Sequence, residues 1–217
     1  MSVFTTTLVV LANIELALWR TVKRGKTVVL TEGDKRVKDR LRAYYTAAGL
    51  SGKQLDHFVA EAAADNQPWS AAFISYLFAS AGAGPAFPVA LAHSRYVTEF
   101  KRNLLADPTR FPFQAWPIGA LPAAVGDVIC VWRDADPKKA GEQQPVIHGK
   151  PVSWSGLDPD NWEHFSSHCD VVVGVSKGFA VAIGGNVGNT VQETRYSLNA
   201  LGIVTHPRGV ALIKNFK

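Results

Sequence analysis

The change in character at Gly126 constrains the fold more than any other feature of this sequence. Before it, apolar residues recur at helical spacing, which predicts helices over residues 6–22, 34–48, 51–64, 69–81 and 90–105. After it, short runs rich in Val, Ile and aromatic residues lie between turn residues, which predicts strands at 127–132, 168–175, 179–183 and 210–213. Helices followed by a small antiparallel sheet predict an α+β fold and exclude Rossmann and TIM-barrel arrangements.

The stretches between these elements indicate one main domain. Residues 107–126 hold four prolines and two glycines, which predicts a loop over the surface or cleft. Residues 134–166 form a polar insertion whose length is typical of a functional or self-packed loop. No linker-like stretch divides the chain, so we expect a domain over 34–217 preceded by an N-terminal helical extension over 1–33.

Charge and cysteine usage narrow the classes of partner. The net charge of +5 and the pI of about 9.3 favour an anionic polymer, and no nucleic-acid-binding signature accompanies them. The basic residues of 20–26 and 35–42 are typical of a solvated helix face and a loop. Cys130 and Cys169 lack CxxC spacing, which argues against a thiolate metal site and leaves a disulfide or two buried thiols. We expect no metal and no cofactor.

The pattern of the apolar run over residues 8–19 predicts neither a signal peptide nor a membrane span. It has no basic segment before it, contains Glu15 and lacks a small-residue cleavage site. It is also too short to cross a bilayer. We therefore expect synthesis in the cytoplasm and, for action at the periplasm or cell envelope, delivery by a specialised route.

Ser70 is the first candidate for chemistry. It lies in PWSAAFISYLFASAG, residues 68–82, where Pro68 suits the start of an apolar helix. The unpaired N–H groups and the dipole of a helix N-terminus would surround its hydroxyl and favour a developing anion there.

His168 and Asn186 are the expected partners of Ser70. If residues 168–175 and 179–186 pair as a hairpin, His168 and Asn186 meet at its open end. An asparagine beside an imidazole orients the ring and fixes its tautomer. Gly184 and Gly185 precede that asparagine and would allow a close approach of the backbone. We therefore expect a ring nitrogen of His168 within hydrogen-bond reach of the Ser70 hydroxyl.

These stretches resemble a known superfamily. PWSAAFIS, SHCDVVVG and GGN are similar, in order and spacing, to motifs of the papain-like NlpC/CHAP superfamily. Together with AHSRY at 92–96, they resemble most closely an uncharacterised bacterial branch of it. The resemblance covers residues 34–215. It implies a papain-like fold and hydrolysis of amide bonds in cell-wall peptides.

Carried onto this chain, the resemblance makes Ser70 the nucleophile, His168 the base and Asn186 the orienting residue. The departure from the family is Ser70 itself, which stands where the catalytic cysteine belongs. A thiol beside an imidazole ionises readily, whereas a serine hydroxyl must lose its proton during attack.

Four further residues are expected to contact substrate: Trp69, His93, Tyr96 and Asp170. His93 could carry a second proton or end its helix in a backbone hydrogen bond. Asp170 faces the same side of its strand as His168, so it is either a second orienting group or a lining carboxylate. Cys169 points to the opposite face and is expected in the core.

Three hypotheses for function stay open on the sequence. The first is a peptidoglycan amidase or endopeptidase, acting as a phage lysin or as an antibacterial effector with a delivery or immunity protein. The second is a catalytically silent papain-like module that binds peptidoglycan or another anionic envelope polymer. The third is an esterase or lipid acyl hydrolase, because serine suits that chemistry.

Overall fold

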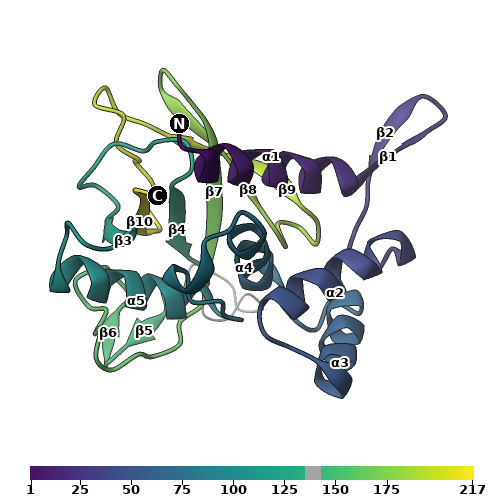
Figure 1. The fold of residues 1–217 in the computed structure, drawn as a ribbon, viewed down its shortest axis with the longest axis horizontal. Coiled ribbons are helices and arrows are strands. Elements are labelled where there is room, and N and C mark those ends of the chain that lie inside the picture. Colours follow the sequence, from purple (N-terminus) through teal and green to yellow (C-terminus); the bar gives the residue numbers. More distant parts are fainter. Residues whose placement is uncertain (135–142) are drawn as a thin grey trace.

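The helices of this protein follow the predicted order. The computed structural model describes residues 1–134 and 143–217, so part of the expected 134–166 insertion lies outside the described residues. The helices are α1 (Val3–Leu18), α2 (Lys38–Ala47), α3 (Gly52–Ala63), α4 (Ser70–Ser80) and α5 (His93–Ala106), with 3₁₀ turns at Lys35–Val37 and Gly84–Ala86. Each overlaps a predicted helix, and the α+β class is confirmed (Figure 1).

A six-stranded antiparallel sheet forms the second half, in the order β3-β10-β4-β7-β8-β9. Its strands are β3 (Phe113–Pro117), β4 (Val128–Trp132), β7 (Ser167–Ser176), β8 (Phe179–Gly184), β9 (Gln192–Ser197) and β10 (Gly209–Asn215). Two small hairpins join β1 (Arg20–Lys23) to β2 (Lys26–Val29) and β5 (Val146–Ile147) to β6 (Lys150–Pro151). The predicted β7–β8 hairpin is confirmed, since Ser176 pairs with Phe179.

The prediction of a loop over residues 107–126 is wrong in part, because residues 113–117 form strand β3. Its prolines argued against a strand, but β3 lies at the edge of the sheet and Pro117 is its last residue. At such a position the missing N–H breaks little of the ladder.

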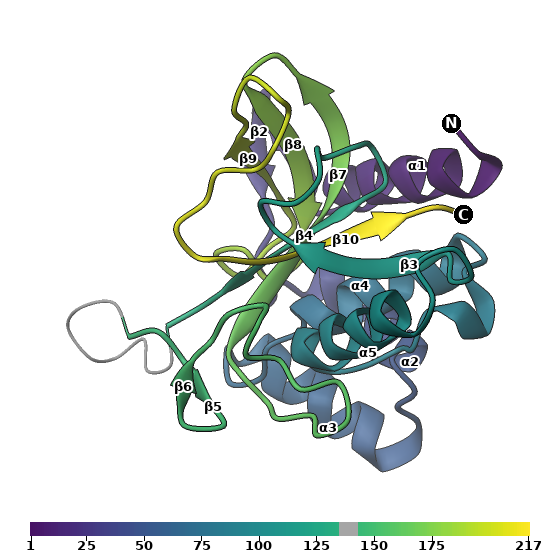
Figure 2. The same ribbon diagram turned by 90° about the vertical axis from the view of Figure 1, so that its left-hand side faces the viewer.

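The two faces of the sheet carry different layers. Helices α1, α4 and α5 cover one face, and Figure 2 shows loops on the other side. Cys169 and Val171 of β7 belong to the core beneath the helices, whereas Val172 belongs to a smaller core on the opposite face. Because side chains alternate along a strand, His168 and Asp170 face the side away from the helices.

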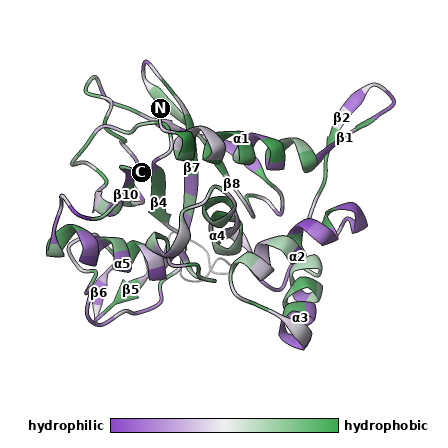
Figure 3. Ribbon diagram, in the orientation of Figure 1, coloured by the Kyte–Doolittle hydropathy of each residue, from purple (hydrophilic) through white to green (hydrophobic). Residues whose placement is uncertain are grey.

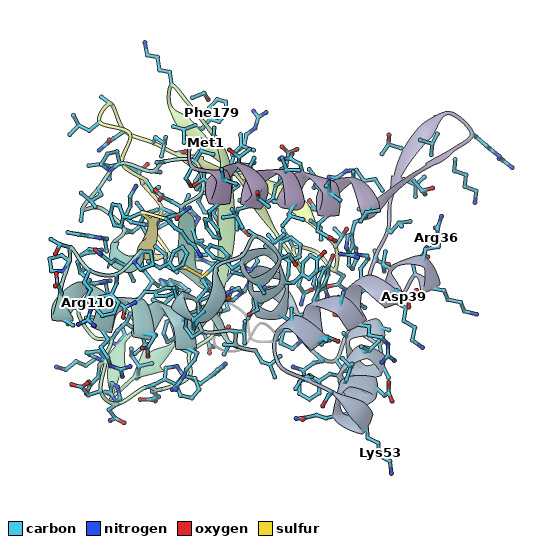
Figure 4. The ribbon with its side chains drawn as sticks, viewed as in Figure 1. Met1, Arg36, Asp39, Lys53, Arg110 and Phe179 are labelled. Carbon is cyan, nitrogen blue, oxygen red and sulfur yellow. A yellow bond between two sulfur atoms is a disulfide. The ribbon has the colours of Figure 1, made fainter. Side chains whose placement is uncertain are left out.

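The two cysteines form a disulfide (Figure 4). Cys130 of β4 and Cys169 of β7 lie directly opposite each other, with their Cα atoms 4.2 Å apart. Both cysteines are buried, which confirms the predicted core position of Cys169. The pairing of β4 with β7 brings the two cysteines together although they are 39 positions apart in the sequence. Of the two alternatives that the sequence left open, the structure therefore has the disulfide rather than two buried thiols.

The N-terminal extension is more than a helix. α1 ends at Leu18, and the chain continues into the β1–β2 hairpin, which projects from the body in Figure 1. The basic stretch 20–26 is therefore a hairpin rather than a helix face and loop. No helix among the described residues is long and apolar enough to cross a membrane.

A buried carboxylate fastens this extension to the main domain. Glu15 is 1% exposed and accepts hydrogen bonds from Arg40 and from the Tyr44 hydroxyl. Trp19, the residue directly after α1, is fully buried and donates to the same hydroxyl at 2.8 Å. The charge that interrupts the apolar run thus pairs across the junction between α1 and α2.

Candidate active site

Ser70 occupies the first position of α4. The preceding residue, Trp69, makes no side-chain cap, and the first backbone bond of the helix runs from Phe73 N to Trp69 O at 2.9 Å. The N–H groups of the first turn therefore have no partners within the helix. Their partial positive charge lies beside the Ser70 side chain.

Aromatic packing fixes this turn in place. Trp69 is fully buried and stacks on Trp19, with ring centroids 4.6 Å apart, while its Nε1 donates to Glu32 Oε2 at 2.5 Å. Trp69 was expected to contact substrate, but its side chain is buried under the start of α4 and does not line either pocket at Ser70. Gly185 closes the other side, because a Cβ there would lie 2.6 Å from atoms of Trp69 and Phe73. The predicted close approach at this glycine is confirmed.

His93 is the hydrogen-bond partner of Ser70. Its Nε2 lies 2.8 Å from the Ser70 Oγ, and its Nδ1 is hydrogen-bonded to the hydroxyl of Tyr96. His93 begins α5, so the two residues come from the starts of adjacent helices. Burial, together with the charges of His168 and Arg133, holds the pKa of His93 well below its usual value. Its imidazole is therefore neutral near pH 7 and can accept a proton.

His168 lies beside this pair but is engaged elsewhere. Its ring contacts that of His93 edge-on, with centroids 5.6 Å apart. Its Nε2 lies 2.6 Å from Asp170 Oδ1 without the alignment of a hydrogen bond, and its Nδ1 accepts from Arg133 at 3.0 Å. We expected His168 at the Ser70 hydroxyl, whereas both of its nitrogens face other groups. His168 faces the same side of β7 as Asp170, which places its ring against that carboxylate rather than at the Ser70 hydroxyl.

Asp170 anchors this second cluster. It is fully buried and accepts from the Tyr196 hydroxyl at 2.7 Å. Although burial raises it, the charge and contact of His168 and the Tyr196 hydrogen bond hold the pKa of Asp170 below its usual value. A Cβ on Gly184 would overlap the Asp170 carboxylate, so only glycine leaves room for this pair. Asp170 therefore acts on His168 rather than facing substrate.

Asn186 and Arg133 meet at the open end of the hairpin. The Asn186 backbone carbonyl accepts from Arg133 at 3.2 Å, and Asn186 has a left-handed backbone, with a φ of 58°. Arg133, rather than the Asn186 amide, therefore contacts Nδ1 of His168. Sequence reasoning missed Arg133, whose only signal was its position directly after a predicted strand. Burial lowers its pKa.

Two pockets adjoin at Arg133 and Pro68, which line both. The first, of about 140 Å³, contains Ser70 and His93 together with residues 164–167. The second, of about 350 Å³, is lined by polar residues that include Asp65 and Asn186. The Ser70 hydroxyl thus lies at the first pocket, and we call the two adjoining pockets the groove. The described part of the chain contains no group of three His, Cys, Asp or Glu side chains placed to hold a metal ion.

The Glu32 carboxyl under Trp69 makes stability depend on pH. Burial is the main cause that raises the pKa of Glu32 to about 7, and Asp65 adds to it. A raised carboxyl pKa gives stability that is full below pH 4.5 and lost as pH rises to about 7. We expect the melting temperature to fall by a few degrees across this window, and Glu32→Gln to flatten that dependence. Differential scanning fluorimetry at several pH values measures this; an unchanged slope in Glu32→Gln would contradict it.

Comparison with known proteins matches most of the chain to one family. Residues 35–216 match the family described as "Uncharacterized protein conserved in bacteria (DUF2272)". No match was found among curated proteins or among solved structures. The matched range holds Ser70, His93, His168 and Asn186, and α1 with its hairpin precedes it. The chain belongs to this bacterial family, whose function is uncharacterised.

Proposed function

We propose that this protein is a papain-like hydrolase that cleaves amide bonds in bacterial cell-wall peptides, with Ser70 as nucleophile. The observation that carries the proposal is the 2.8 Å contact between Ser70 Oγ and His93 Nε2 at an uncapped helix start. It combines a nucleophile, a base and donors for a developing oxyanion in one place. The resemblance to the NlpC/CHAP motifs supplies the substrate class.

In this proposal each atom of the site has a role in acyl transfer. Ser70 Oγ attacks the carbonyl carbon while its proton passes to His93 Nε2, which later protonates the leaving amine. This requires the ring proton of His93 on Nδ1, where the Tyr96 oxygen accepts it. The N–H groups of the first turn of α4 stabilise the oxyanion. Water then hydrolyses the acyl-serine by the same route in reverse.

His93 replaces His168 as the proposed base because its Nε2 already contacts the hydroxyl. His168 keeps a role in this proposal as the neighbour that, with Arg133, disfavours protonation of the His93 ring. Asn186 positions Arg133 through its carbonyl. The assignment of His168 as base and Asn186 as orienting residue remains the competing hypothesis for the same reaction.

Two further features support action at the cell envelope. The disulfide between Cys130 and Cys169 is of a kind that persists in oxidising compartments. The net charge of +5 favours approach to anionic polymers. Both suit a phage lysin or an antibacterial effector that reaches peptidoglycan through a delivery protein and is held in check by an immunity protein.

Purified protein is expected to release new amino termini from bacterial peptidoglycan, and to do so more slowly at high salt. Salt screens charges beyond roughly 8 Å at physiological ionic strength, so it weakens the attraction between the cationic protein and the polymer. Amine labelling of the digest at several salt concentrations measures both effects. Binding to peptidoglycan without amine release would favour the silent binding module.

An esterase or lipid acyl hydrolase is the second candidate. The observation in its favour is that the neutral His93 and a serine suit ester cleavage, because an ester oxygen can leave as an alkoxide whereas an amide nitrogen must first be protonated. Fatty acid released from phospholipid or short-chain esters, with peptidoglycan left intact, would replace the peptidase proposal with this one.

A further inference from the structure

The outward face of α1 is unusual for a helix at the surface. Its exposed apolar side chains are Val3, Val10, Ile14 and Leu18, each at least 47% exposed. At 100° per residue these positions fall within one narrow stripe. The single charged residue of α1, Glu15, is buried to one side of this stripe. Figure 3 accordingly colours most of α1 as hydrophobic. A helix that is apolar on both sides is typical of one that is covered.

The β1–β2 hairpin follows α1 and adds exposed valines on both of its faces, together with positive charge. Its exposed apolar residues are Val22, Val28 and Val29. Its cations are Arg20, Lys23, Arg24 and Lys26, and residues 16–31 include no Asp or Glu. We call this set, together with the α1 stripe, the α1–hairpin surface. Figure 4 shows cationic side chains reaching outward from the tip of the hairpin.

The hairpin tip is crowded with like charge. Lys23 pairs directly with Lys26 across the strands, and Arg24 lies in the turn between them with a φ of 52°. Like charges directly opposite each other destabilise a strand pair. Within residues 1–134 and 143–217, none of these three cations has an ion-pair partner. An external anion would relieve this repulsion.

We propose that the α1–hairpin surface docks on an anionic lipid bilayer. The exposed apolar side chains would enter the boundary between headgroups and acyl chains, while the hairpin cations lie among the phosphates. A second copy of the chain fits poorly, because symmetric pairing would bring two sets of unpaired cations together. A polysaccharide would neutralise the cations but offer no hydrocarbon to the valines, Ile14 and Leu18. This proposal is independent of the chemistry at Ser70.

Vesicle co-sedimentation tests the proposal. The full chain is expected to bind phosphatidylcholine vesicles that contain about one-third phosphatidylglycerol, and to stay in solution with pure phosphatidylcholine. The triple variant Lys23→Gln, Arg24→Gln, Lys26→Gln should bind roughly 100-fold more weakly, since each cation near an anionic surface contributes about a factor of five. The variant Lys53→Gln, Lys150→Gln, Lys177→Gln removes the same charge from other exposed sites and should bind as wild type.

A second pair of variants separates lipid from other occupants. Ile14→Ser with Leu18→Ser should weaken binding at least tenfold, whereas the matched exposed changes Leu105→Ser and Leu201→Ser should not. Binding that needs the cations but not Ile14 and Leu18 would indicate a polyanion site and overturn the proposal. The proposal would also be overturned if the wild-type protein did not bind vesicles that contain phosphatidylglycerol. It would equally be overturned if the wild type formed dimers and the Ile14→Ser change abolished them. Circular dichroism of each variant confirms that it is folded.

Discussion

Replacing Ser70 with alanine is expected to lower the rate of amine release from peptidoglycan about 1,000-fold or more. The change removes the atom that we propose attacks the carbonyl, and binding plus the donors of the α4 start would leave a small residual rate. Stability should change little, because the side chain is small and its hydrogen bond to His93 contributes about 1 kcal/mol. Single-turnover amine labelling and a urea titration measure the two effects.

Ser70→Cys is the matched variant for this prediction. The first turn of α4 and the neighbouring imidazole favour a thiolate, so the cysteine variant should retain activity or exceed wild type. Equal rates in wild type and Ser70→Ala would contradict the assignment of Ser70 and leave the silent module as the better account. A loss in both variants with unchanged stability would show that the site requires a hydroxyl.

His93→Gln is expected to lower the rate about 1,000-fold, and His168→Gln only about tenfold. A positioned general base contributes roughly 100- to 10,000-fold, and His93 is the residue whose Nε2 contacts Ser70. Because burial holds the pKa of His93 well below its usual value, the ring stays neutral on mild acidification. The rate in wild type should therefore stay nearly constant as pH falls through 6.5, which a pH–rate profile measures.

The opposite order of effects would support the competing assignment. A His168→Gln variant that loses activity while His93→Gln keeps it would make His168 the base, as the family resemblance implies. Asn186→Ala adds a check, since its backbone carbonyl, and with it the Arg133 contact, survives the change. We expect Asn186→Ala to retain most activity; a large loss would require the amide itself.

Local patterns in the sequence predicted what depends on local chemistry. The five helices, the β7–β8 hairpin and the close approach at Gly184 and Gly185 follow from periodicity, a Lys-Gly turn and the absence of a Cβ. β3 could not be predicted this way, because its position at the sheet edge, which tolerates Pro117, depends on long-range pairing with β10.

The candidate site shows the same division. Ser70 was placed correctly at a helix start, and the alternation of β7 correctly separated His168 from Cys169. Alternation does not tell which of the two neighbours faces the helices, and the disulfide partner on β4 turns Cys169 that way. His168 consequently faces Asp170, and His93 takes the place at Ser70.

The Cys130–Cys169 bond also closes residues 130–169 into a covalent ring. Most of the residues in this ring belong to the 134–166 insertion. Tying residues 39 positions apart removes chain entropy from the unfolded state worth about 4 kcal/mol. With the ring closed, the ends of the insertion are held together whatever lies between them. Insertions of different length or sequence could then be exchanged at low entropic cost, since loop closure depends only weakly on length. Residues 164–167 of this ring line the pocket at Ser70, so the pocket wall can diversify while Arg133 and His168 keep their positions.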